Sequence, residues 1–145
     1  MTTVLLVEDN TQVRVSMVKS FTMAGIGVIE AADGEEALSL IDRGGYDLII
    51  TDLWMPKVDG IALLKHLATH RPETKVIAIS GGAPGRAPIE FSAALAQTYG
   101  ADAVFHKPFD NDDLIDVVNR LVSVDPSAVG GTGKVATNSG VAQLP

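Results

Sequence analysis

Cysteine is absent from this chain of 145 residues. Disulfide frameworks, thiolate metal sites and thiol redox chemistry are therefore excluded. Long apolar runs are missing too, since no stretch approaches the ~20 residues that a membrane-spanning helix needs. The N-terminus also lacks the basic region and long apolar stretch of a signal peptide. We therefore expect a cytoplasmic protein with no membrane partner.

Positive charge is scarce. The 11 Lys and Arg residues are outnumbered by 18 Asp and Glu residues, which gives a net charge of −7 and a pI near 4.7. Because such a surface repels phosphate backbones, we expect no nucleic-acid partner. Hydrophobic residues make up 46% of the chain. This length and composition support one domain with a true core rather than two domains.

What the chain does contain is a regular alternation of short apolar runs and segments of helical period. The apolar runs are residues 3–7, 28–31, 48–51, 76–79 and 103–106. The helical segments run through Val13–Ala24, from the cap Asp33 to Gly44, from Asp59 or Gly60 to Arg71, and over about 88–99 and 111–124. Five such strand–helix units predict a parallel sheet that right-handed crossovers cover on both faces.

The composition changes beyond about Ser127, where glycine, serine, threonine and alanine dominate. We expect one domain over residues 1–124 and a flexible tail over 125–145. Gly133-Lys134 is similar to part of a phosphate-binding loop, but Ala128 stands at the first glycine position and Val135 at the Ser or Thr position. No strand precedes this pair either, so a nucleotide site is not supported.

Polar residues follow four of the predicted strands. Glu8 and Asp9 follow the first strand and Asp52 the third, while Ser80 follows the fourth and Lys107 the fifth. Because parallel strands end at one edge of a sheet, ligands bind in the crevice outside that edge. Clustered carboxylates there require a cation, and a lysine beside them requires an anion. A divalent metal together with a phosphoryl group satisfies both requirements.

Together these residues resemble a response-regulator receiver domain of two-component signalling, and the resemblance covers residues 1–124. The matching motifs are Glu8-Asp9, Asp52 with Met55-Pro56 downstream, Ser80-Gly81 and Lys107-Pro108-Phe109. The resemblance implies an α/β flavodoxin-like (βα)5 fold with strand order 2-1-3-4-5. It also implies a phosphorylation-dependent signalling switch that receives its phosphoryl group from a sensor histidine kinase or a histidine phosphotransfer protein.

The resemblance further implies roles for the acidic residues. Asp52 would be the phosphoacceptor, forming an acyl phosphate. Asp9, Asp52 and the backbone carbonyl of Trp54 would bind Mg²⁺ directly, and Glu8 would act through water. Mn²⁺ would substitute for Mg²⁺. This ligand set agrees with the preference of magnesium for a few carboxylates and several waters.

The remaining matched residues would contact the phosphoryl group. Lys107 would pair with its oxygens, and the Ser80 hydroxyl would bond to another oxygen and move toward it on phosphorylation. The resemblance also implies a cis peptide bond between Lys107 and Pro108.

Three departures from the common receiver pattern concern the switch. Val104 stands where Tyr or Phe usually swings inward, and Phe105 points to the opposite face of its strand. We therefore expect switching to depend on Ser80, Gly81 and Gly82, at the start of a long loop over 81–88. Trp54 is bulky for its position and is expected to cover the acyl phosphate. Output is expected through the face formed by the fourth helix, fifth strand and fifth helix, with homodimer formation on phosphorylation as a further expectation.

Several alternatives remain open. A phosphorylation-independent pseudo-receiver typically loses an acid, the phosphoacceptor or the lysine. A dehalogenase-like phosphatase needs a second acid two residues after its nucleophile, where Trp54 stands, so we do not expect a turnover enzyme. His66 and His70 have zinc-ligand spacing, but an exposed helix face is the favoured interpretation. We expect a stand-alone receiver without a DNA-binding domain, the alternative being a fragment of a longer regulator.

Overall fold

The computed structural model describes residues 1–55, 57–81, 94 and 96–123. In these residues the strands are β1 (Thr3–Val7), β2 (Gly27–Ala31), β3 (Leu48–Asp52), β4 (Lys75–Ser80) and β5 (Ala103–His106). They form one sheet in the order β2-β1-β3-β4-β5, and every neighbouring pair is parallel. The predicted fold class and strand order are confirmed.

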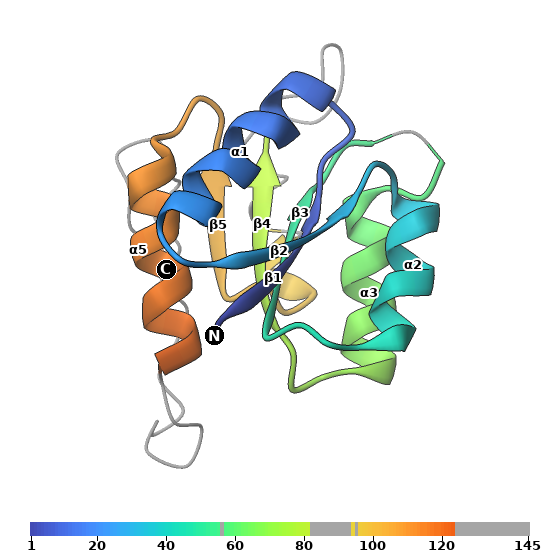
Figure 1. Ribbon diagram of the computed structural model, residues 1–145. Helices are drawn as coiled ribbons and strands as arrows, with labels where there is room; N and C mark the ends of the chain where they lie inside the picture. The colour runs from blue at the N-terminus through green and yellow to red at the C-terminus, as the bar shows by residue number, and fades with distance from the viewer. Residues whose placement is uncertain (56, 82–93, 95, 124–145) are drawn as a thin grey trace.

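Helices cover both faces of the sheet (Figure 1). The helices α1 (Thr11–Met23) and α5 (Asn111–Ser123) lie on one face, and α2 (Gly34–Arg43) and α3 (Gly60–His70) lie on the other. Side chains alternate along each strand, so Leu6 packs with α1 and α5 while Leu5 packs with α2 and α3. Burial on both faces explains why the strands other than β2 are nearly continuous runs of buried residues, whereas the edge strand β2 is only partly buried and includes the exposed Glu30.

Aspartate side chains cap the N-termini of α2 and α3, the two helices on the same face of the sheet. Asp33 caps α2 by accepting a hydrogen bond from the backbone N–H of Glu36 at 2.8 Å. Asp59 caps α3 through the N–H of Ala62 at 2.9 Å. The sequence left Asp59 and Gly60 as alternative first residues of α3. The structure assigns Asp59 as the cap and Gly60 as the first helical residue.

Some predictions fall wholly or partly outside the described residues. Of the helix expected over 88–99, residues 94 and 96–99 are described; residues 94 and 96–98 are helical, and residue 99 lies in a turn. The tail over 125–145, Val124, Gly82 and most of the 81–88 loop lie outside the described residues. Within the described part of the chain, no helix is long and apolar enough to span a bilayer.

Candidate functional site

The five residues predicted to follow the strands lie at the C-terminal edge of the sheet. Glu8 and Asp9 follow β1, and Lys107 follows β5. Asp52 and Ser80 are themselves the last residues of β3 and β4, one position further into the strands than the sequence indicated. Asp52 is in register with Ile79 of β4. The sheet itself therefore holds the proposed nucleophile and the hydroxyl-bearing residue.

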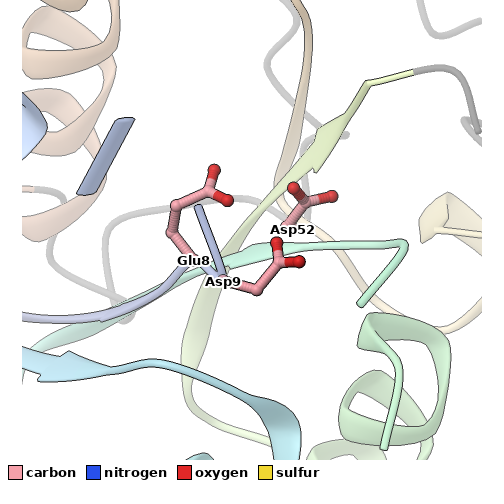
Figure 2. Close-up of side chains that lie close together, drawn as sticks. All are labelled: Glu8, Asp9 and Asp52. Atoms are coloured by element: carbon pink, nitrogen blue, oxygen red, sulfur yellow. The ribbon is translucent and has the colours of Figure 1, made fainter. Parts of the chain in front are cut away.

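Three carboxylates gather at this edge (Figure 2). One carboxylate oxygen from each of Glu8, Asp9 and Asp52 lies within 4.8 Å of the others, and no other described residues form such a group of three potential ligands. Glu8 and Asp52 are buried, with 1% and 4% of their surfaces exposed, whereas Asp9 is exposed. Carboxylate oxygens next to solvent suit Mg²⁺, which binds through few protein ligands and retains several waters.

Trp54 lies beside these acids through its backbone. Its N–H donates a hydrogen bond to Oδ1 of Asp52 at 3.1 Å, so the chain turns tightly after β3. The backbone also makes a close approach at Gly60, where an added Cβ atom would overlap the carbonyl oxygen of Asp52. The start of α3 is thus packed directly against the backbone of Asp52. The metal-binding role of the Trp54 carbonyl stays a prediction.

Lys107 bridges the two buried acids. Its Nζ atom lies 2.8 Å from Oδ2 of Asp52 and 3.0 Å from Oε1 of Glu8. Burial alone would lower the pKa of Lys107, but the hydrogen bond to Asp52 and the charges of both acids raise it. The lysine is therefore fully charged at neutral pH. It offsets a repulsion between close carboxylates of about 4 kcal/mol per pair at an effective dielectric of 20.

Glu8 is held at both carboxylate oxygens. Oε1 faces Lys107, and Oε2 accepts a hydrogen bond from the backbone N–H of Asn10 at 3.0 Å. Burial raises the pKa of Glu8, and the charge of Asp52 adds to this effect, whereas the Asn10 N–H and Lys107 oppose it. The net pKa is higher than that of an ordinary glutamate. A cation at this edge would favour its ionised form.

Ser80 carries a buried hydroxyl on the strand next to β5. The residue is fully buried, and no described residue forms a hydrogen bond with its Oγ atom. Its carbonyl oxygen accepts a hydrogen bond from the N–H of Lys107 at 2.9 Å. Gly81 follows, and a Cβ atom there would lie 3.0 Å from Cδ of Lys107. A buried hydroxyl without a partner is costly, so this atom is suited to a ligand oxygen.

The structure around Lys107 agrees with what was expected from the sequence. The Lys107–Pro108 peptide bond is cis. Val104 is fully buried in the cluster that contains α2 and α3, whereas Phe105 lies on the opposite face of the sheet. Phe105 packs edge-on against Phe109, with ring centroids 5.7 Å apart. The prediction that Phe105 and Val104 face opposite sides is confirmed.

His66 and His70 lie far from the acids, on α3. Their rings stack with centroids 4.3 Å apart, and Nδ1 of His70 lies 3.0 Å from the carbonyl oxygen of His66. His66 is more enclosed than the expected exposed face, because its Nε2 atom lies 3.6 Å from Asp42 of α2. Within the part of the chain that the structure describes, the two histidines belong to no three-ligand group of the kind that the acids form.

Two residues near the acids were missed in the sequence. Asn10 caps α1 by accepting a hydrogen bond from the N–H of Val13 at 3.0 Å. A capping-type residue ahead of a helical period was the available signal. Arg14 donates a hydrogen bond from Nη1 to the carbonyl oxygen of Glu8 at 2.7 Å. No sequence pattern indicates that contact, because it depends on how α1 packs.

Comparisons with known proteins agree with this geometry. Residues 4–119 match the family described as "Response regulator receiver domain". The chain is 37% identical over 125 residues to the sensor kinase CckA of Brucella abortus, a match that covers 83% of this chain and 12% of that protein. It is 34% identical to the transcriptional regulatory protein CpxR of Escherichia coli, with 84% of this chain and 50% of that protein covered. The chain thus spans half or less of these relatives.

A solved structure and a shorter relative match along nearly their whole length. The receiver domain of the Francisella response regulator 1452 has a TM-score of 0.76 and 35% identity, with 85% of this chain and 98% of that chain covered. The response regulator receiver protein CpdR of Brucella abortus is 29% identical, with 82% of this chain and 95% of that protein covered. With the five-stranded fold and the acidic edge, these matches show that the chain belongs to the response-regulator receiver domain family.

Proposed function

We propose that this chain is a phosphorylation-dependent signalling switch that accepts a phosphoryl group on Asp52 from a phosphohistidine. The observation that carries the proposal is the position of Lys107, 2.8 Å from Asp52 and 3.0 Å from Glu8. A buried nucleophilic carboxylate, a charged lysine and two further acids are the groups that phosphoryl transfer to an aspartate needs. The phosphohistidine would belong to a sensor histidine kinase or a histidine phosphotransfer protein.

In the transfer, a carboxylate oxygen of Asp52 attacks the phosphorus and forms an acyl phosphate. The P–N bond to the histidine ring breaks, and the ring keeps the bonding electron pair and takes up a proton. Lys107 moves its charge from the carboxylate to the phosphoryl oxygens, and the Ser80 hydroxyl donates a hydrogen bond to one of them. The chain accepts one phosphoryl group per molecule, without turnover of a substrate.

Bound Mg²⁺ would neutralise phosphoryl oxygens and align them with the nucleophile. Asp9, Asp52 and the Trp54 carbonyl would hold it directly, and Glu8 would act through water. The spacing of the three acids supports this assignment. The exposure of Asp9 also supports this assignment, because Asp9, alone of the three acids, is open to solvent and to the waters that magnesium retains.

Partners would use two different surfaces. A groove of about 600 Å³ opens beside Lys107 between α1 and the segment that follows β5, with Gln12, Met17 and Phe109 in its lining. We assign this groove to the phosphohistidine-bearing partner. Output would use the face of β5 and α5 together with the helix predicted over 88–99, by protein contact, onward phosphotransfer or homodimer formation. The N–H of Lys107, directly after β5, is bonded to Ser80, which links the site to that face.

Labelling with a small phosphoryl donor tests the proposal. Acetyl phosphate or phosphoramidate with Mg²⁺ should add the mass of one phosphoryl group, and Asp52→Asn should abolish the addition because an amide is no nucleophile. Asp116→Asn is the matched control, since Asp116 is exposed on α5 and lies outside the site. That variant should be labelled like the parent.

Each alternative has its own outcome in this experiment. A parent protein that takes no label would be a phosphorylation-independent binding module. Continuous release of phosphate from excess donor, without a stable adduct, would indicate a phosphatase. Label on Asp52→Asn would show that another residue is the acceptor.

A further inference from the structure

We propose that Arg14 is a positioning residue of the metal site, which fixes the Glu8–Asp9 peptide so that the Asp9 carboxylate stays close to Asp52. This inference rests on the proposed function, because it assigns Mg²⁺ to the Glu8, Asp9 and Asp52 set. Arg14 lies on α1 and would not itself contact the metal.

The guanidinium group of Arg14 makes two hydrogen bonds at once. Nη1 donates to the carbonyl oxygen of Glu8 at 2.7 Å, and Nε donates to Oε1 of Glu30 at 3.2 Å. Only 15% of the Arg14 side chain is exposed, so the group is held within the protein. The 2.7 Å bond is short, as expected when the donor is charged. Arg14 therefore connects α1, β2 and the end of β1 at the edge that carries the acids.

Asp9 depends on its backbone more than the other two acids do. The Glu8 carboxylate is held by Lys107 and Asn10, and that of Asp52 by Lys107 and Trp54. Asp9 is exposed, and among the described residues its carboxylate has no hydrogen bond or ion pair. The region that this carboxylate can reach is therefore set mainly by the backbone that positions its Cα and Cβ atoms.

The peptide plane that precedes Asp9 is the group that Arg14 binds. The carbonyl of Glu8 belongs to the planar unit that joins Glu8 to Asp9, so fixing its oxygen also fixes the start of Asp9. The N–H of Glu8 is held as well, by the carbonyl oxygen of Ala31 at 3.1 Å. Both backbone polar groups of Glu8 are thus anchored to neighbouring elements. Removal of Arg14 would leave the carbonyl group of Glu8 without this anchor.

An arginine suits this position better than a lysine. A guanidinium is planar, stays charged and presents several N–H donors in a fixed fork. It can therefore bond to the Glu8 carbonyl and to Glu30 together. An ammonium group is a point charge on a flexible stem and does not reproduce the fork. Arg14→Lys, which keeps the charge but not the fork, therefore separates the effect of geometry on Mg²⁺ binding from the effect of charge.

A magnesium titration of the metal-free protein tests the inference, with the fluorescence of Trp54, the one tryptophan, as the signal. Arg14→Met and Arg14→Lys should each bind Mg²⁺ about tenfold more weakly than the parent, as is typical when an outer partner of a metal ligand is lost. Arg120→Met is the matched control, because Arg120 is exposed on α5 and its loss changes the net charge equally. The control should stay within about twofold of the parent.

A second measurement separates positioning from a general loss of structure. At saturating Mg²⁺, the rate of Asp52 labelling by acetyl phosphate in Arg14→Met should return to the parental value. Thermal unfolding without Mg²⁺ identifies the temperature at which every variant is folded, and titrations are done there. Arg14→Lys, which keeps charge and length, provides the test if Arg14→Met does not fold.

Three results would overturn the inference. The first is parental Mg²⁺ affinity in Arg14→Met. The second is parental Mg²⁺ affinity in Arg14→Lys, which would show that the charge of residue 14, and not the geometry of its donors, supports Mg²⁺ binding. The third is a labelling rate that stays low at saturating Mg²⁺. If the parent itself neither binds Mg²⁺ nor takes label on Asp52, it is the proposed function that fails.

Discussion

Lys107 is paired with Asp52 across the edge of the sheet, with 2.8 Å between Nζ and Oδ2. The same nitrogen lies 3.0 Å from Glu8. The lysine thus neutralises, in the unphosphorylated protein, the acids that would bind the metal. A metal ion and Lys107 stabilise the same negative charge, and this shared role leads to the first prediction.

Lys107→Met should make Mg²⁺ bind more tightly and phosphorylation slower. Without the ammonium group, Glu8 and Asp52 lose their cation. The metal-free protein should therefore lose about 1–3 kcal/mol of unfolding free energy, a range that already allows for solvent screening of the partly exposed lysine. Mg²⁺ should restore much of this. Labelling should slow by at least about tenfold, because the phosphoryl oxygens lose a charged donor.

Urea unfolding and a Trp54 fluorescence titration measure these effects. Lys19→Met is the control, since Lys19 is an exposed lysine on α1 outside the site. Unchanged or weaker Mg²⁺ binding by Lys107→Met would contradict the view that the lysine and the metal stabilise the same charges.

Ser80→Ala should leave stability unchanged or raise it by up to about 1 kcal/mol, because it removes a buried hydroxyl that has no partner among the described residues. The same change should weaken binding of beryllofluoride, a phosphoryl mimic, since one hydrogen bond to the mimic is lost. Ser20→Ala is the matched control, as Oγ of Ser20 accepts a hydrogen bond from Asn111 at 3.0 Å. It should be destabilising and leave the mimic bound normally.

Denaturation and isothermal titration with beryllofluoride and Mg²⁺ give both quantities. A Ser80→Ala protein that is clearly less stable than the parent would mean that the hydroxyl already has a favourable contact. The role proposed for it as a free phosphoryl donor would then be wrong.

Gly60→Ala should be strongly destabilising and should impair phosphorylation. The added methyl group would overlap the carbonyl oxygen of Asp52 and the Cα atom of Leu53, so the backbone at the acceptor must move. We expect a cost of about 3 kcal/mol, at the upper end for an overpacked site. Gly45→Ala is the control, because Gly45 has φ of 91° but open space around it. It should cost only the backbone strain, about 1–2 kcal/mol.

Chemical denaturation and the rate of acetyl phosphate labelling distinguish the two glycines. If Gly60→Ala were no more harmful than Gly45→Ala, the close approach of α3 to Asp52 would not constrain the site.

The group of acids and the lysine at the edge of the sheet could be predicted from the sequence, because the order of the strands alone brings these residues together. Asp52 and Lys107 are 55 positions apart, yet each comes at or just after the end of a buried strand, and parallel strands end together. Gly60 and Arg14 could not be assigned in this way. Their roles depend on the distance at which α3 and α1 pack, and neither glycine nor arginine at those positions has a periodic or motif signal. The capping role of Asp33 was predictable, since a cap is a local feature.

The stability that Asp33 contributes should depend on acid pH. Its pKa lies below the ordinary value of 3.8, chiefly because the N–H of Glu36 donates to it and secondarily because Lys57 lies near. A lowered folded-state pKa gives stability that is complete above 3.8 and is lost as pH falls through the folded-state value. Asp33→Asn keeps a capping oxygen but cannot titrate. The parent should therefore be the more stable protein at pH 6, and its advantage should shrink toward pH 2.

Urea unfolding of both proteins across this range provides the comparison. A difference that stays constant from pH 6 to pH 2 would show that ionisation of Asp33 contributes nothing to the cap.

Trp54→Asn should shorten the lifetime of the acyl phosphate. The Trp54 N–H is bonded to the Asp52 carboxylate, and its ring is half-buried against the α2 and α3 side of the core, so the residue is fixed beside the acceptor. Hydrolysis requires water to approach the phosphorus in line with the acyl oxygen, and the bulky ring of Trp54 would obstruct that approach if it covered the acyl phosphate. Asparagine keeps the backbone contact, opens the space and offers a group that can orient water.

Loss of radiolabel from the purified phosphoprotein measures the rate, and Trp54→Phe is the matched control because it keeps an aromatic ring. Phosphate should leave Trp54→Asn several times faster than it leaves the parent, with Trp54→Phe close to the parent. Equal rates in all three proteins would show that the ring does not shield the site. A slower rate in Trp54→Asn would place the barrier elsewhere, because shielding by bulk can only lengthen the lifetime of the parent.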